Sequence, residues 1–339
     1  MSFRWLAFLF LLLPCSASAQ ELLMRRHYYH DTCPDPLSNH IRSRKYYELV
    51  TDTNDRWTVN DSVTEYYDRK GRLTSIICQN RRSDTKDHIR NRHYFYYDRK
   101  GRITCDSSFI DGKTEVITYE YHGSQAIIHN PPSKWSDILP LVYINYDANG
   151  KRISQYRVNA SGDTVNRWEV NGNTTTDTWF SRAEDGRYKP TSTSIEIKSP
   201  GRFADYVTIY HEDDTSHTVY LSAYNPAGQI IEHIYVGQEE RRDTINYYYT
   251  NNLLTFYERR VFVHADHRFI QYETYKYNER GQLIELREWS DGFEDNPTVR
   301  QYVYNERGLL SEINVWHEYA DGRPNYHVRK ERFEYTFYK

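Results

Sequence analysis

Apolar and aromatic residues alternate with polar residues over short runs throughout most of the chain, and a turn sequence separates each run from the next. Alternation with a period of two places one set of side chains on each face of a strand. Runs of roughly eight residues bounded by Asn, Asp and Gly are typical of strands joined as hairpins. The pattern therefore predicts antiparallel β-structure, with a final strand over residues 332–338.

One turn sequence recurs, and we call it the frame: an aromatic residue, Asp or Asn, two variable residues, Gly, one variable residue and usually Leu or Ile. Asp or Asn opens a type I turn, because its side chain can accept hydrogen bonds from backbone groups a few residues on. Gly accepts the left-handed conformation that closes the hairpin with a bulge. We interpret the frame positions as structural; they are Tyr67, Asp68, Gly71, Tyr97, Asp98, Gly101, Tyr146, Asp147, Gly150, Tyr224, Asn225, Gly228, Tyr277, Asn278, Gly281, Tyr304, Asn305 and Gly308.

The frames recur at intervals of about 25–30 residues, the length of a two-stranded repeat unit. We therefore expect an all-β protein of antiparallel hairpin repeats that form one long twisted, coiled sheet. The repeat domain is predicted to cover residues 61–339, with degenerate repeats at 155–222 and an N-terminal cap segment at 20–60.

The assignment of side chains to faces is ambiguous. Strict alternation from Tyr277 places Leu283 and Trp289 on one face and Leu286 on the other. Either both faces of the sheet are partly covered, or a bulge shifts the register within the strand.

The composition favours a folded, sheet-rich protein. Aromatic residues make up 16% of the chain, with 33 Tyr, although the mean hydropathy is −0.89. A disordered chain has few aromatic residues and a high net charge, whereas this chain has a net charge of −3. A charge this close to neutral argues against nucleic acid as a partner.

The N-terminus has the organisation of a signal peptide over residues 1–19. Arg4 is followed by the apolar run Leu6 to Leu13 and then by the small residues Ala17 to Ala19. We expect cleavage before Gln20, which makes the protein periplasmic, secreted or exposed at the cell surface. The apolar run is too short to span a bilayer, and no transmembrane segment is predicted after cleavage.

Four cysteines leave alternatives open. Cys15 raises the alternative of a lipid-modified cysteine in the signal segment. Cys78 and Cys105 lie in successive repeats, and an exported protein can form a disulfide between them. Buried or free thiols are an equally good interpretation, and with Cys33 one thiol stays unpaired in any case.

Residues with obvious catalytic or metal-binding spacing are missing from the sequence, so no catalytic residue, cofactor or metal site is predicted. Trp289 and Trp316 occupy equivalent positions in adjacent units. They are candidates for stacking on a sugar ring, and filling a face of the sheet is the alternative. The basic residues Arg99, Lys100 and Arg102 are left free for function, because turn chemistry and cross-strand packing explain the other residues of their frame.

The frames at 67–73 and 97–103, Tyr-Asp-Arg-Lys-Gly-Arg followed by Leu or Ile, resemble the Rhs/YD-repeat family, which is named for this Tyr-Asp pair. The later frames depart from that pattern, with Asn in place of Asp. The resemblance implies a long antiparallel sheet that coils on itself. In large members of the family such a sheet encloses a toxin, but this chain is too short for such a shell, and the toxin role is not transferred.

These observations lead to three functional hypotheses. The first is an exported, non-catalytic binding or structural module with a protein or glycan ligand. The second is a periplasmic or surface hydrolase whose carboxylates are brought together only by folding. The third is an outer-membrane β-barrel, which alternation counts against, because Glu285 and Arg287 would share a face with Leu283 and Trp289.

Overall fold

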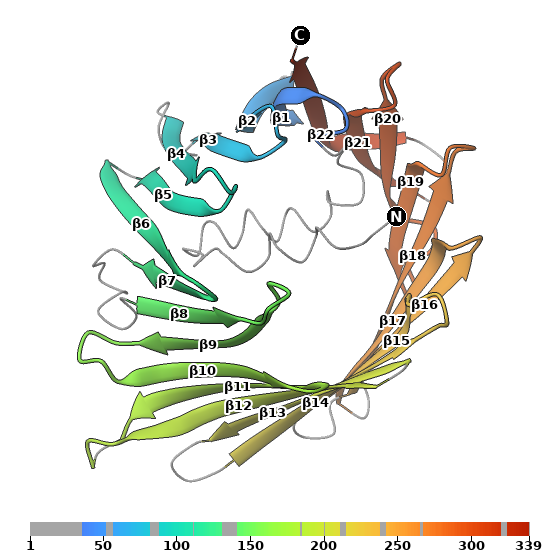
Figure 1. The fold of residues 1–339 in the computed structure, drawn as a ribbon. Helices are drawn as coiled ribbons and strands as arrows, with labels where there is room; N and C mark the ends of the chain where they lie inside the picture. Colours follow the sequence, from blue (N-terminus) through green and yellow to red (C-terminus); the bar gives the residue numbers. More distant parts are fainter. Residues whose placement is uncertain are drawn as a thin grey trace.

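The computed structural model describes residues 36–51, 57–81, 88–110, 112–130, 141–183, 185–199, 201–210, 215–237, 242–264, 267–319 and 324–338. The predicted signal segment, Cys15 and Cys33 lie outside these residues. The described segments form one 22-stranded sheet (Figure 1). Within these ranges no helix is long and apolar enough to cross a membrane.

The strands follow one another around the sheet in chain order. Their bounds are β1 Ile41–Thr51, β2 Trp57–Tyr67, β3 Leu73–Arg81, β4 His88–Tyr97, β5 Ile103–Ile110, β6 Lys113–His122, β7 Gln125–His129, β8 Leu141–Tyr146, β9 Arg152–Val158, β10 Thr164–Asn171, β11 Thr174–Arg182, β12 Tyr188–Ser199, β13 Arg202–Tyr210, β14 Thr215–Tyr224, β15 Ile230–Val236, β16 Arg242–Thr250, β17 Leu253–His264, β18 His267–Tyr277, β19 Leu283–Ser290, β20 Thr298–Tyr304, β21 Leu310–Glu318 and β22 Pro324–Phe337.

The sheet is a closed barrel, and the expectation of one long twisted, coiled sheet is wrong. Strand β1 pairs antiparallel with β2 on one side and with β22 on the other, and Figure 1 shows the first and last strands side by side. Every strand therefore has two neighbours. Closure satisfies the backbone groups that two free edges would expose. The local repeat pattern of the sequence is the same in an open coil and in a ring, so it did not reveal the pairing of β1 with β22.

A bulge after each frame explains the ambiguity in face assignment. In the first frame Tyr67 pairs with Leu73, whereas Tyr66 pairs with Ser75, so that Thr74 is an extra residue. The same shift separates Tyr277 from Lys276 in the frame at 277–283. One extra residue reverses the alternation beyond it. The expectation that Leu283 and Trp289 share a face is therefore wrong, and Leu283 shares its face with Leu286.

The face that carries the frame tyrosines is the more buried one, and we call it the inner face. In β6, Ile117, Tyr119 and Tyr121 are half-buried or buried, while the intervening Val116, Thr118 and Glu120 are exposed. Side chains on the concave side of a curved sheet lie closer together than those on the convex side, so we assign the more buried face to the inside of the ring. We call the opposite, more exposed side of the sheet the outer face.

The apolar core is divided into patches along the inner face. The largest surrounds Leu310 and Ile313, a second surrounds Ile128 and Ile144, and a third surrounds Ile76. Buried polar residues also lie on this face, among them Glu331, which pairs with Ile313, and Asn166. Such thin apolar burial agrees with a chain rich in Tyr and poor in aliphatic residues.

Candidate functional site

The frame tips adopt the turn that their Asp, Asn and Gly residues predict. In the first tip the Gly71 amide donates to the Asp68 carbonyl over 3.0 Å, and the Asp68 carboxylate accepts from the amides of Lys70 and Arg72. The glycines have positive φ, which glycine adopts without strain. Their φ values are 72° for Gly71, 84° for Gly101, 77° for Gly150, 79° for Gly228, 73° for Gly281 and 74° for Gly308.

Each of the first two tips is tied to the next unit by a contact that we call the ion-pair clasp. The Arg72 guanidinium donates to the Asp68 carboxylate over 2.7 Å and lies 4.5 Å from the centre of the Tyr97 ring. The Tyr97 hydroxyl donates to the Leu73 carbonyl over 2.7 Å. The second tip repeats these contacts with Asp98, Arg102, Tyr121 and Ile103.

Two later tips use a neutral arrangement that we call the amide clasp. The Asn278 side-chain amide donates to the Gln282 side-chain oxygen over 2.9 Å. The Gln282 amide in turn donates to the Gly308 carbonyl of the next tip over 2.8 Å. The Tyr304 hydroxyl again donates to a carbonyl, that of Leu283, over 2.8 Å. The tip at 224–230 has the same pattern with Asn225, Gln229, Asn252, Tyr249 and Ile230.

The expectation that Arg102 is free for function is therefore wrong, because Arg102 ties two units together. Arg99 and Lys100 remain exposed at the same tip. Sequence reasoning missed the role of the sixth frame position, although a signal was present. Arg follows Asp four residues on in two frames, and Gln follows Asn at the same spacing in two others.

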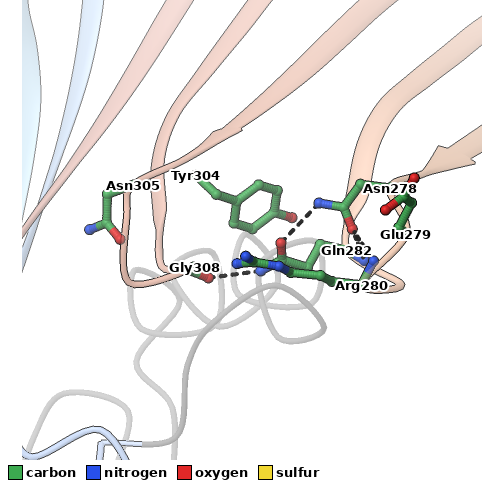
Figure 2. A pocket seen from close by; sticks show the side chains of 7 residues that line it. All are labelled: Asn278, Glu279, Arg280, Gln282, Tyr304, Asn305 and Gly308. Carbon is green, nitrogen blue, oxygen red and sulfur yellow. Dashed lines mark hydrogen bonds between the residues drawn. The ribbon is translucent and has the colours of Figure 1, made fainter.

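The tips at 277–283 and 304–310 enclose a shallow pocket of about 340 Å³. Figure 2 shows the Tyr304 ring on one side, with Asn278, Gln282 and Arg280 opposite it. Glu279, Asn305 and Gly308 complete the lining. The pocket thus combines one aromatic ring with charged and amide groups.

Trp289 and Trp316 both lie on the outer face. The Trp289 ring stacks on Tyr272 with centroids 5.6 Å apart, and Tyr272 stacks on Phe256 at 6.1 Å. Trp316 pairs across the ladder with Val299, a residue with 0% exposure. The two indoles thus contribute to packing on this face and do not meet in one site, since β20 separates their strands. Their stacking on a ligand stays a prediction.

The candidate disulfide is not formed. Neither Cys78 nor Cys105 is in a disulfide, and the first is buried whereas the second is partly exposed. Cys78 pairs with Val63 on the inner face, whereas Cys105 pairs with Tyr96 on the outer face of β5. With β4 between them and their side chains on opposite faces, the two sulfurs cannot approach bonding distance.

The inner face places two carboxylates of neighbouring strands opposite each other. Glu273 and Glu288 are cross-strand partners, and Glu288 forms a 2.8 Å ion pair with Arg300. Burial raises the pKa of Glu273, although a hydrogen bond from the Tyr275 hydroxyl opposes the shift. A carboxylate pair suits acid–base chemistry only where substrate can reach it. Glu273 is 8% exposed, and neither glutamate lines the pocket between the tips.

Asp106 is a buried acid of the inner face with apolar neighbours. Its cross-strand partners are Phe95 and Ile117, and its Oδ1 atom has no hydrogen-bond partner. Burial raises its pKa to about 6. Among the residues that the structure describes, no group of three or more His, Cys, Asp or Glu side chains is placed to hold a metal ion.

Comparisons with known proteins give no family. No family model matches the chain, and no curated protein matches it. The resemblance to the YD-repeat family therefore stays a prediction.

Solved structures with some likeness were found at low similarity. A porin-like protein from Bacteroides uniformis is 12% identical, with 90% of this chain and 99% of that chain covered, at a TM-score of 0.30. A porin-like protein from Bacteroides vulgatus is 10% identical, with 88% and 99% covered, at a TM-score of 0.25. The structure of TcdB2-TccC3 is 10% identical, with 86% of this chain but only 17% of that chain covered, at a TM-score of 0.34. Similarity at this level carries no argument about the function of this chain.

Proposed function

We propose that the protein is an exported, water-facing β-barrel with a non-catalytic binding or structural role. The observation that supports this proposal is the row of ion pairs on the outer face. Glu285 pairs with Lys276 and with Arg287, each over 2.7 Å, and Arg287 also pairs with Glu318 over 2.9 Å.

These charges lie where a lipid-facing band would have to be apolar. Glu285 and Arg287 are in the body of β19, and Glu258 and Arg260 form a 2.9 Å pair in the middle of β17. Placing an Arg or Lys at the bilayer midplane destabilises a barrel by about 2–4 kcal/mol per residue. Several such residues on adjacent strands favour water as the solvent.

The strand lengths support the same conclusion. A strand needs about 9–11 residues to cross a bilayer. Strand β7 has 5 residues, β8 has 6, and β9, β15 and β20 have 7 each. Strands this short suit a barrel whose outer face is wet.

The test is the behaviour of residues 20–339 without detergent. We expect this protein to purify from the aqueous fraction and to elute as one defined species, with a far-UV circular dichroism spectrum of β-sheet. The variant E285R/R287E, which exchanges the two residues and keeps the net charge, is the matched control. It should purify from the aqueous fraction as the wild type does. Sedimentation with membranes, or a strict need for detergent, would exclude the water-facing barrel.

An outer-membrane barrel is the second candidate, and closure of the ring favours it. A membrane-spanning sheet must have no free edge, and outer-membrane barrels are antiparallel with an even number of strands. The 22-stranded closed order fits that requirement. Recovery of the native protein in the outer-membrane fraction, in a form whose gel mobility changes on heating, would support this candidate over the first.

We also propose that the role is non-catalytic. The cross-strand acids Glu273 and Glu288 are engaged by Tyr275 and Arg300, on a face whose side chains cover one another. A purified protein that hydrolyses a panel of chromogenic glycosides and esters, and loses this activity on E288Q, would overturn that part of the proposal.

A further inference from the structure

The pocket between the tips at 277–283 and 304–310 lies where the ion-pair tips place a guanidinium. In the ion-pair tips a guanidinium occupies the space over the next frame tyrosine: Arg72 lies 4.5 Å from the Tyr97 ring and Arg102 lies 4.1 Å from the Tyr121 ring. In the tip at 277–283 the same position holds Gln282. Its shorter side chain is held between Asn278 and Gly308, by bonds of 2.9 and 2.8 Å.

Among the cation–ring contacts of the described residues, none involves Tyr304. The Tyr304 ring instead lines the pocket of about 340 Å³. The Tyr304 hydroxyl is fixed by its 2.8 Å bond to Leu283, so the ring is oriented before any ligand arrives. A fixed aromatic face reduces the entropy that a ligand must lose on binding. The site is therefore preformed for a flat group of the size that a guanidinium fills in the earlier tips, or larger.

The charges around the pocket limit what that group can be. Glu279 and Arg280 both line it, so their formal charges cancel. Because the two charges are opposite, the pocket has no net attraction for a cation or for an anion. The same two side chains, together with the Asn305 amide, offer hydrogen-bond donors and acceptors that are open to solvent. An uncharged ligand with many hydroxyl groups and one apolar face satisfies all of these constraints.

We propose that this pocket binds an uncharged pyranose, with the C–H face of the sugar on Tyr304 and its hydroxyls on Glu279 and Arg280. The inference rests on the binding role proposed above and names its ligand class. Because the pocket is shallow and the ligand is small, we expect a Kd on the order of 1 mM for a single sugar.

The experiment is ligand-observed NMR on residues 20–339 with a panel of neutral methyl pyranosides. At least one of them should show saturation transfer from the protein, strongest at the protons of one ring face. Q282R restores the guanidinium that fills this space in the earlier tips, and we expect it to weaken binding at least tenfold. Q229R makes the same change in the amide tip at 224–230, and it should leave binding unchanged.

A second pair of variants covers the case in which Q282R fails to fold. The double substitution E279A/R280A removes the exposed hydrogen-bonding groups, and it should weaken binding about fivefold or more. R99A/K100A removes two exposed tip residues in the second frame and should have no effect.

Three results would overturn the inference. These are the absence of transfer to every pyranoside, equal transfer in wild type and Q282R, and binding of arginine methyl ester or sulfate in place of the sugars. A need for detergent would exclude the water-facing barrel but would not test the pocket. In that case the sugar titration of the same protein in micelles would still test whether the pocket binds a pyranose.

Discussion

The first two frame tips and the two amide-clasp tips are both bonded to the next hairpin, but through different chemical groups. All four tie one hairpin to the next through the sixth frame position. In the tips at 67–73 and 97–103 that residue is an Arg paired with Asp and stacked on Tyr. In the tips at 224–230 and 277–283 it is a Gln paired with Asn and bonded to a carbonyl. The ion-pair clasp fills the space over the next tyrosine, whereas the amide clasp between 277–283 and 304–310 leaves that space open as a pocket.

The largest predicted difference between the two kinds of tip concerns their glycines. A Cβ at Gly71 would lie 2.6 Å from the Leu37 Cβ and 2.9 Å from the Leu37 backbone nitrogen, whereas a Cβ at Gly281 would have no neighbour within 4 Å. Both residues have positive φ, which destabilises an alanine by about 1–2 kcal/mol. We expect Gly71→Ala to lower the free energy of unfolding by about 3 kcal/mol, because the steric overlap adds to that strain. Gly281→Ala should lower it by about 1 kcal/mol.

Urea denaturation followed by tryptophan fluorescence measures both changes. Equal effects would mean that Leu37 does not cover the first tip, and the distinction between a covered and an open tip would be lost.

The second prediction concerns the difference in pKa between an aspartate of a tip, Asp98, and an aspartate of the inner face, Asp106. Asp98 lies at the tip of the β4–β5 hairpin and Asp106 lies within β5 opposite Phe95, and their pKa values move in opposite directions. The backbone amide and side chain of Arg102 lower the pKa of Asp98, whereas burial raises that of Asp106 to about 6. A raised carboxyl pKa means that the charged form is destabilising, so the protein gains stability as the pH falls through 6 toward the ordinary value of 3.8.

Asp106→Asn removes that charge, and it should stabilise the protein by about 2 kcal/mol at pH 7.5 and have little effect near pH 4. Thermal denaturation at the two pH values gives the comparison, with Asp106→Glu as the control that retains the charge. A variant that is less stable than wild type at pH 7.5 would show that Asp106 has a charged partner.

The third prediction exchanges the clasps. Asp68→Asn should lower the free energy of unfolding by about 1 kcal/mol, because a partly buried, charge-assisted hydrogen bond to Arg72 is lost. Burial of Asp68 opposes ionisation, but its hydrogen bonds with Arg72 and Lys70 prevail and lower its pKa. The contribution of this pair is therefore present above the ordinary value of 3.8 and is lost as the pH falls through the lower, folded pKa.

In the amide tip, Asn278→Asp removes the donor to Gln282 and should have a similar effect, about 1 kcal/mol. The double variant N278D/Q282R should recover most of that loss, since it rebuilds the ion-pair clasp. A double-mutant cycle with a coupling energy near zero would show that the two positions act independently.

The smallest predicted difference concerns the tyrosine hydroxyls, which both kinds of tip use alike. Tyr97 donates to Leu73 over 2.7 Å, and Tyr304 donates to Leu283 over 2.8 Å. Each substitution by Phe should lower the free energy of unfolding by about 1 kcal/mol, because a carbonyl loses its partner. Chemical denaturation of the two variants should give equal shifts. A much larger effect at Tyr97 would mean that the Arg72 stack depends on the hydroxyl.

A tyrosine hydroxyl bonded to a backbone carbonyl also joins the two ends of the described chain where the ring closes. The Tyr338 hydroxyl donates to the Tyr67 carbonyl, and Arg69 lies 5.9 Å from the centre of the Tyr338 ring. The last strand therefore joins the first frame through the kind of contact that joins neighbouring units.

Much of the architecture could be predicted from the sequence, but the candidate site could not. The alternation and the frames predicted strands, hairpins and tips, because the chemistry of a turn depends on a few consecutive residues. The pocket depends on Gln282 and Tyr304, which belong to different units, and its significance appears only when Gln282 is compared with Arg72. Trp289 and Trp316 recur in equivalent positions, yet the bulge after each frame places them on the outer face.

The sequence by itself determined the β class, the repeat unit and the conformation of each tip, since Asp, Asn and Gly act over distances of two to four residues. Only the tertiary structure decided that the sheet closes. The pairing of β1 with β22 joins residues nearly three hundred positions apart, such as Tyr46 and Phe333, and it depends on how twist and curvature accumulate over all the strands between them. The faces were decided in the same way, because each bulge is local but its consequence extends along the whole strand that follows it.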